Sequence, residues 1–173
     1  DSFWEGVSEG TNLPYSAVLL AFISTSLHAI ACSQSQNVGH CSTISAWGSE
    51  TENGNLLAGT NADGAAFSVT NFSPVLLMFP REGNCFIANG GISSNLVMNG
   101  KGMVGMASNG GWNGRPDDVG VGLPGVIPTV FHTWKYATAQ EAVAFAAKNG
   151  VSAAENLHFV DKQTGAYVLE HTK

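Results

Sequence analysis

The sequence predicts an α+β protein in which two sheets stack against each other and helices cover them. The first observation is the order of the elements. A helical segment precedes a long series of short strand-like segments, and a second helix then precedes two more strands. The second observation is the composition. The 173 residues are 44% hydrophobic and only 12% charged, with 21 glycines, which is typical of one globular domain with a sizeable core and many turns.

The N-terminal part predicts one amphipathic helix followed by a loop. Asn12-Leu13-Pro14 is typical of a helix start, because asparagine caps a helix and proline fits its first turn. From there to about Ala31, apolar side chains recur at helical spacing. They are Val18, Leu19, Phe22, Ile23, Leu27 and Ile30. Residues 33–39 are polar and end on a glycine, so we expect an exposed loop there.

The middle of the chain predicts a series of strands. Short apolar segments follow one another, with polar or glycine-rich breaks between them. They cover residues 43–47, 55–59, 66–70, 75–79, 85–88 and 103–107. Asn53-Gly54 is a strong hairpin signal between the first two, because both residue types tolerate the positive φ of a tight turn.

The C-terminal part predicts a second helix and a hairpin. Thr138-Ala139-Gln140-Glu141 is a capping box that opens a helix, and Asn149-Gly150 closes it. Residues 156–160 and 166–169 then predict two antiparallel strands. Because an isolated two-stranded hairpin is not stable, we expect it to pair with the earlier strands or with a part of the sheet that this chain lacks.

Charge and hydropathy exclude several classes of protein. The net charge is −6 and the few Lys and Arg residues are scattered, which argues against a nucleic-acid partner. The longest apolar run, residues 17–23, is far shorter than the roughly 20 residues that a membrane-spanning helix needs. The three cysteines have no metal-ligand spacing, and we expect neither a metal nor a cofactor, although Cys32 and Cys85 remain able to pair.

Cys41 is the foremost candidate for chemistry. It lies at the junction of the exposed loop and the first predicted strand. A cut between His40 and Cys41 would leave a thiol and a free α-amine on one residue, and that amine would act as the base that a nucleophile needs. The alternative is a buried free cysteine, which is the commoner role of an unpaired thiol.

Three polar residues at predicted strand ends are candidates to assist Cys41. Asn61 and Asp63 end the second strand, and pairing across Asn53-Gly54 would return that end to Cys41. A carboxylate there would orient the new α-amine. Asn109 follows a strand and is a suitable oxyanion donor. Each has an alternative interpretation as an ordinary turn residue.

Two further groups of residues are weaker candidates. Residues 110–128 predict a long loop rich in glycine and proline, and Trp112 and Arg115 within it are candidate substrate contacts by position alone. His132 and His158 would each serve a papain-like Cys-His arrangement with Cys41, but a structural role is the more common one for such histidines.

Taken together, these motifs resemble the N-terminal-nucleophile (Ntn) hydrolases of the acyl-coenzyme A:6-aminopenicillanic acid acyltransferase type (peptidase family C45). Penicillin V acylases and bile salt hydrolases are relatives of this family. The resemblance covers nearly the whole chain and rests on the order of five segments. They are Glu5 to Gly10 with the following helix, Cys41-Ser42-Thr43, Gly59 to Asp63, Met98 to Met103 leading to Asn109, and Gly122-Leu123-Pro124 with the later helix and residues 161–170. Thr60 stands where bile salt hydrolases carry arginine, which argues against bile-salt-like substrates.

The resemblance implies a four-layer αββα sandwich and self-cleavage before Cys41. Residues 1–40 would be a pro-segment that stays associated after the cut, and residues 41–173 the first part of the catalytic domain, with a later oxyanion asparagine and an arginine lying beyond Lys173. Cys41 would attack a small amide or thioester and form an acyl-enzyme that water or an amine resolves. Asp63 and Asn61 match the residues that support the nucleophile. The other class of function is an unprocessed or degenerate domain with a binding or structural role.

Overall fold

A computed structural model describes residues 2–20, 41–62, 75–89, 95–109, 122–123, 127–150 and 155–171. Several predictions fall outside these residues: the loop 33–39, the strand 66–70 and most of the loop 110–128. The described part confirms a mixed α+β fold, with two antiparallel sheets and a few helices. None of the described helices has the length and apolar composition needed to cross a membrane.

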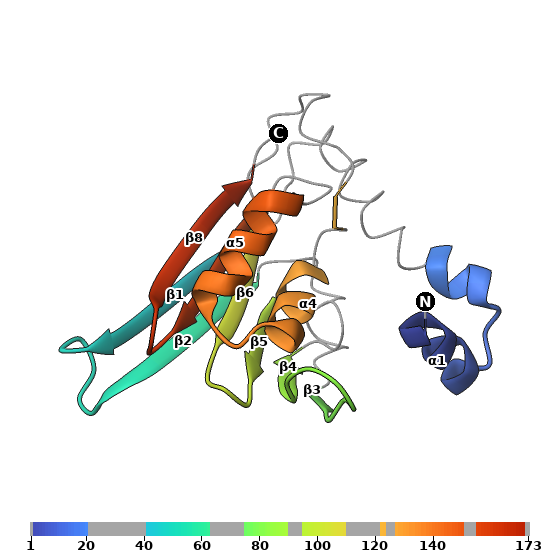
Figure 1. Ribbon diagram of the computed structural model, residues 1–173, viewed down its shortest axis with the longest axis horizontal. Coiled ribbons are helices and arrows are strands. Elements are labelled where there is room, and N and C mark those ends of the chain that lie inside the picture. Colours follow the sequence, from blue (N-terminus) through green and yellow to red (C-terminus); the bar gives the residue numbers. More distant parts are fainter. Residues whose placement is uncertain are drawn as a thin grey trace.

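The larger sheet has six antiparallel strands in the order β3-β4-β5-β6-β7-β8 (Figure 1). Neighbours in the sheet are also neighbours in sequence, so each connection is a hairpin or, between β6 and β7, the segment that carries the helices. The strands are β3 (Val75–Met78), β4 (Phe86–Asn89), β5 (Leu96–Asn99), β6 (Val104–Asn109), β7 (Glu155–Asp161) and β8 (Gly165–His171).

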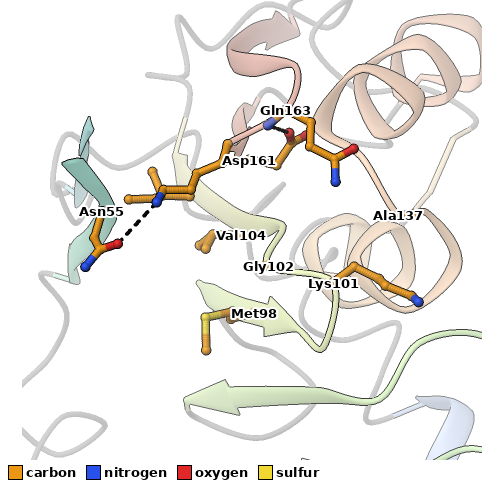
Figure 2. Close-up of a pocket in the computed structure, with 10 residues that line it drawn as sticks. Asn55, Met98, Lys101, Gly102, Val104, Ala137, Asp161 and Gln163 are labelled. Carbon is orange, nitrogen blue, oxygen red and sulfur yellow. Dashed lines mark hydrogen bonds between the residues drawn. The ribbon is translucent and has the colours of Figure 1, made fainter. Parts of the chain in front are cut away.

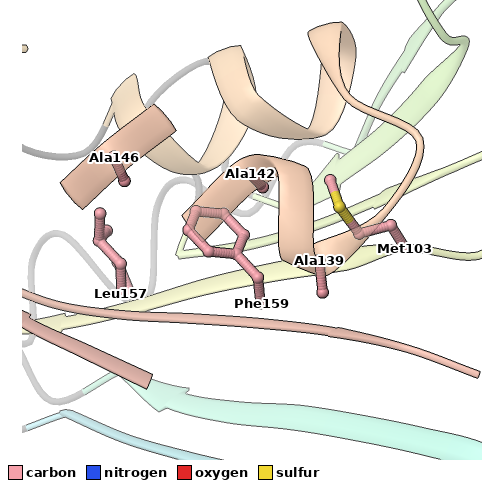
Figure 3. Packing of buried hydrophobic residues seen from close by; sticks show 7 residues of the cluster. Met103, Ala139, Ala142, Ala146, Leu157 and Phe159 are labelled. Atoms are coloured by element: carbon pink, nitrogen blue, oxygen red, sulfur yellow. The ribbon is translucent and has the colours of Figure 1, made fainter. Parts of the chain in front are cut away.

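Two helices, α4 (Ile127–Lys135) and α5 (Ala139–Asn149), cover one face of this sheet (Figure 1). Under α5, Leu157 and Phe159 of β7 meet the small side chains Ala139, Ala142 and Ala146 (Figure 3). The alanines recur at helical spacing, and their small size lets the helix axis approach the strand closely. This contact explains why the alanine-rich segment forms a helix on the sheet.

The approach of α4 is equally close. A Cβ atom at Gly105 of β6 would lie only 2.6 Å from the Thr133 hydroxyl, so glycine is required there. The buried Asn99 side chain donates hydrogen bonds of 2.9 Å to the carbonyls of Thr133 and Tyr136. It thereby satisfies carbonyls at the end of α4 that have no partner within the helix.

The second sheet is the antiparallel pair β1 (Cys41–Gly48) and β2 (Gly54–Ala62). It packs on the face of the larger sheet that α4 and α5 leave free, where Leu56 and Ala58 contact a core cluster of Val104, Met106 and Val160. In this part of the molecule the layers are therefore helices, six-stranded sheet and two-stranded sheet. A separate helix, α1 (Ser2–Thr11), precedes them in sequence.

Several local predictions are confirmed. Gly54 has a φ of 64° in the β1–β2 turn, as the Asn53-Gly54 signal predicts. Thr138 and Glu141 form the capping box of α5, and Gly150 ends that helix with a φ of 67°. The predicted C-terminal hairpin pairs with the earlier strands through β6.

Other predictions are confirmed in part or need correction. The helix start predicted at Asn12-Leu13-Pro14 is confirmed, because a helical segment covers residues 15–20, and the remainder of that prediction to about Ala31 lies outside the described residues. The upstream helix α1 was not predicted. The loop prediction for 110–128 is wrong at its end, since α4 begins at Ile127. The strand β5 and the helix α4 were not predicted. β5 has only four residues, and α4 follows a glycine- and proline-rich stretch.

Asp161 joins α5 to the β7–β8 turn. Its carboxylate accepts hydrogen bonds from the backbone of Ala139, Gln163 and Thr164 and from the Thr164 hydroxyl. Burial alone would raise the pKa of Asp161, but these hydrogen bonds together hold the pKa below its usual value. The carboxylate is therefore charged at neutral pH and ties the first turn of the helix to the sheet.

We expect Asp161→Asn to lower the free energy of unfolding by about 2 kcal/mol, because it replaces a charged acceptor of four hydrogen bonds by a neutral amide. Urea denaturation at pH 7 measures this change. Glu52→Gln, at an exposed position in the β1–β2 turn, is the control. An equal effect of both substitutions would contradict the assigned role.

Candidate functional site

Cys41 is the first residue of β1 and is half-buried. Side chains alternate along a strand, so Cys41, Thr43 and Ser45 share one face of β1. That face points toward the six-stranded sheet, because Thr43 and Ser45 both hydrogen-bond to His158 of β7. The thiol therefore lies at the edge of the space between the two sheets.

Asn95 contacts this thiol and was missed by the sequence-based prediction. Its side-chain amide nitrogen lies 3.8 Å from the Cys41 sulfur and is placed to donate to it. The backbone carbonyl of Asn95 accepts a 3.1 Å hydrogen bond from the Ala107 amide of β6, which fixes Asn95 at the entrance to β5. The residue follows Ile92-Ser93-Ser94, a segment without a motif, so only the fold could reveal this contact.

The hairpin returns to Cys41 as expected. Cys41 pairs with Ala62, the residue directly before Asp63. Asp63 itself lies outside the described residues, as does His40 on the other side of Cys41. The hydrogen-bonded orientation of an α-amine by Asp63 therefore stays a prediction.

The remaining predicted site residues are not brought together with Cys41 by the described residues. Asn61 pairs with Ser42, so it lies on the outer, exposed face of the hairpin rather than on the face of Cys41. Asn109 ends β6 opposite Glu155, but its side chain lies outside the described part. Trp112 and Arg115 also lie outside it.

The two histidines of the papain-like alternative are engaged elsewhere. His158 is 7% exposed, and its Nδ1 and Nε2 atoms lie 3.2 Å from the Thr43 hydroxyl and 3.1 Å from the Ser45 hydroxyl. Burial lowers the pKa of His158, so its imidazole is neutral at neutral pH. His132 belongs to α4 and is fully buried among the rings of Tyr136, Phe145 and Phe159. Both observations favour structural roles for these side chains.

Glu155 is a buried carboxyl at the start of β7. It is 6% exposed, and its Oε2 atom has no hydrogen-bond partner among the described residues. Burial raises the pKa of Glu155 to about 8, from an ordinary value of 4.5. The side chain is therefore protonated and neutral at pH 7.

A cavity of about 320 Å³ lies at the opposite end of the hairpin from Cys41 (Figure 2). Asn55 at the start of β2 and Lys162 in the β7–β8 turn line it, and the lysine donates a 3.1 Å hydrogen bond to the Asn55 side chain. Cys41 pairs instead with the last residue of β2, so the cavity is not the site of the thiol. Within the described ranges, no three His, Cys, Asp or Glu side chains gather as a metal site would require.

Comparison with models of known protein families gives no match for this chain, and comparison with curated protein sequences gives none either. The candidate site therefore rests on the residues and contacts described above.

We expect Asn95→Ala to slow the alkylation of Cys41 by iodoacetamide at pH 7.5 about fivefold. The amide donor stabilises the reactive thiolate, and one hydrogen bond contributes about 1 kcal/mol. The rate is measured by mass spectrometry in a chain whose other cysteines are serine. Asn55→Ala, at the far end of β2, should leave the rate unchanged. An unchanged rate in Asn95→Ala would show that the contact has no chemical effect.

The buried Glu155 should make stability depend on pH. Between pH 4.5 and 8 the folded chain holds a proton that the unfolded chain has lost, so the free energy of unfolding should fall as pH rises, by up to about 1.4 kcal/mol per pH unit. Glu155→Gln should abolish this slope, and the exposed Glu170→Gln should keep it. Urea titrations from pH 6.5 to 8, above the range in which the lowered pKa of His158 gives a slope of opposite sign, measure the fall, and a fall that survives in Glu155→Gln would refute the assignment.

Proposed function

We propose that this chain belongs to a self-processing cysteine hydrolase or acyltransferase of the Ntn type, with Cys41 as its nucleophile. The observation that supports this most directly is the half-buried thiol at the first position of β1 with an amide donor 3.8 Å from its sulfur. A cut before Cys41 would make it the first residue of a new chain, so its free α-amine would lie beside its thiol at the start of β1. The thiol also lies at the edge of the space between two sheets, where a substrate carbonyl can approach it.

The proposed reaction begins with hydrolysis of the His40–Cys41 peptide bond, which frees the Cys41 α-amine. That amine takes the thiol proton, and the sulfur attacks the carbonyl carbon of an amide or thioester. The carbon–nitrogen or carbon–sulfur bond then breaks, the leaving group takes the proton, and the acyl group stays on sulfur. Water or an amine releases it.

The residues around Cys41 have distinct proposed roles. The Asn95 amide is placed to donate to the sulfur. Asp63, which directly follows the strand partner of Cys41, would orient the α-amine. We retain Asn61 and Asn109 as candidates for binding or oxyanion stabilisation, and Trp112 and Arg115 as candidate substrate contacts.

We further propose that the full protein is a four-layer αββα sandwich, with residues 1–40 as its pro-segment. Uncovered apolar faces support this. Ile44 and Leu57 on the outer face of the hairpin are 70% and 62% exposed, and Leu77 and Met98 on the six-stranded sheet are 61% and 47% exposed. Apolar sheet faces are normally covered by another layer, so additional strands and helices of the same polypeptide would fit here.

Self-cleavage is the decisive property of this proposal. Mass spectrometry of the purified complete gene product should find two co-purifying fragments, the second beginning at Cys41. Cys41→Ala should abolish the cut, because it removes the attacking sulfur, whereas Cys85→Ala should leave it intact. An uncut chain with an unreactive Cys41 would instead identify an unprocessed binding or structural domain. Hydrolytic activity in an uncut chain would identify a conventional cysteine protease.

A further inference from the structure

The two strands of the hairpin are held to the six-stranded sheet by different forces. From β2, Leu56 and Ala58 pack on the core cluster of Val104, Met106 and Val160. β1 also lies against β6, and its inner side chains make polar contacts: the hydroxyls of Thr43 and Ser45 with His158, and the thiol of Cys41 with Asn95. Apolar packing is non-directional and hydrogen bonds are directional, so these polar contacts act together with the backbone pairing to β2 in fixing where β1 lies along the sheet.

His158 contacts β1 at two points. Its two ring nitrogens lie 3.2 Å and 3.1 Å from hydroxyls that are two residues apart on the same face of the strand. A neutral imidazole has one donor and one acceptor nitrogen, and a hydroxyl is able to play either part, so both hydrogen bonds form together. Because the ring is rigid and buried, sliding β1 in either direction would break at least one of them.

The same sheet also fixes the partner of the thiol. Asn95 is bound through its carbonyl to Ala107 of β6, and β6 pairs directly with β7, where His158 faces Met106. Cys41 precedes Thr43 and Ser45 on the inner face of β1. The site of His158 on β7, together with the pairing of β1 with β2, therefore influences how far the Cys41 sulfur lies from the Asn95 amide.

We propose that His158 is a positioning residue for Cys41, which holds β1 through Thr43 and Ser45 so that the thiol meets Asn95. The importance of this positioning for catalysis rests on the proposed function. Its structural content, the coupling of His158 to the thiol–amide contact, is measurable without substrate or cleavage. In this arrangement a histidine near the nucleophile acts through hydrogen bonds to the strand and not as the base.

A double-mutant cycle tests this coupling. In the chain with Cys41 as its single cysteine, Asn95→Ala should slow alkylation about fivefold, the effect of one hydrogen bond. In a His158→Phe background, the same substitution should have almost no effect, because the contact is already lost. Val160→Ala is the matched control: it shortens a core side chain on the same face of β7 without touching the hydroxyls, so it should preserve the Asn95 effect.

Milder variants test the same coupling in case His158→Phe does not fold. Thr43→Val and Ser45→Ala should each reduce the Asn95 effect. His158→Asn and His158→Gln, which keep an amide near the place of one ring nitrogen, should restore part of it. Near-ultraviolet circular dichroism checks that each variant is folded. An Asn95 effect of equal size in wild-type, Ser45→Ala and folded His158 variants overturns the inference, and so does the absence of any effect in wild type. Failure of self-cleavage alone would overturn the proposed function but not this coupling.

Discussion

The burial of β7 on both faces is the constraint on which the described structure depends. One face, with Leu157 and Phe159, meets the alanines of α5, and the other presents His158 to β1. A strand enclosed in this way has no water for its polar side chains, so each must find a partner or lose its charge. Asp161 finds four donors, His158 finds two hydroxyls, and Glu155 remains protonated. Helix placement, hairpin placement and pH sensitivity thus have one origin.

Much of this fold could be predicted from local patterns. The Asn53-Gly54 turn and the capping box at Thr138 depend only on neighbouring residues, and both form as expected. Two elements escaped prediction for opposite reasons. β5 has only four residues, and it is a strand because β4 and β6 flank it. α4 follows a glycine- and proline-rich stretch, and it depends on Gly105 and Asn99, which lie in the sheet below it.

In the candidate site, too, some features are predictable from local sequence and others depend on the fold. A cysteine at a loop–strand junction is visible in the sequence, and the return of β2 to Cys41 follows from the hairpin. The contact of Cys41 with Asn95 joins one sheet to the other, and no periodicity or spacing in the sequence predicts it. The same holds for the imidazole between Thr43 and Ser45. Sequence patterns describe neighbours along a strand well, but they do not show which strand lies across the gap.

The irregularity between Ala46 and Gly48 has a consequence for how such a site tolerates change. The pairing of β1 with β2 shifts there by one residue, and beyond the shift Cys41 meets Ala62 on the inner face. Strand side chains alternate with a period of two, so a one-residue change in this part of β1 keeps the sulfur inside only where a bulge such as this one absorbs it. A one-residue change that the pairing does not absorb would turn the thiol outward and bring Ser42 in. The residue count between the β1–β2 turn and Cys41, corrected by the bulge, thus sets which face of the hairpin carries the thiol.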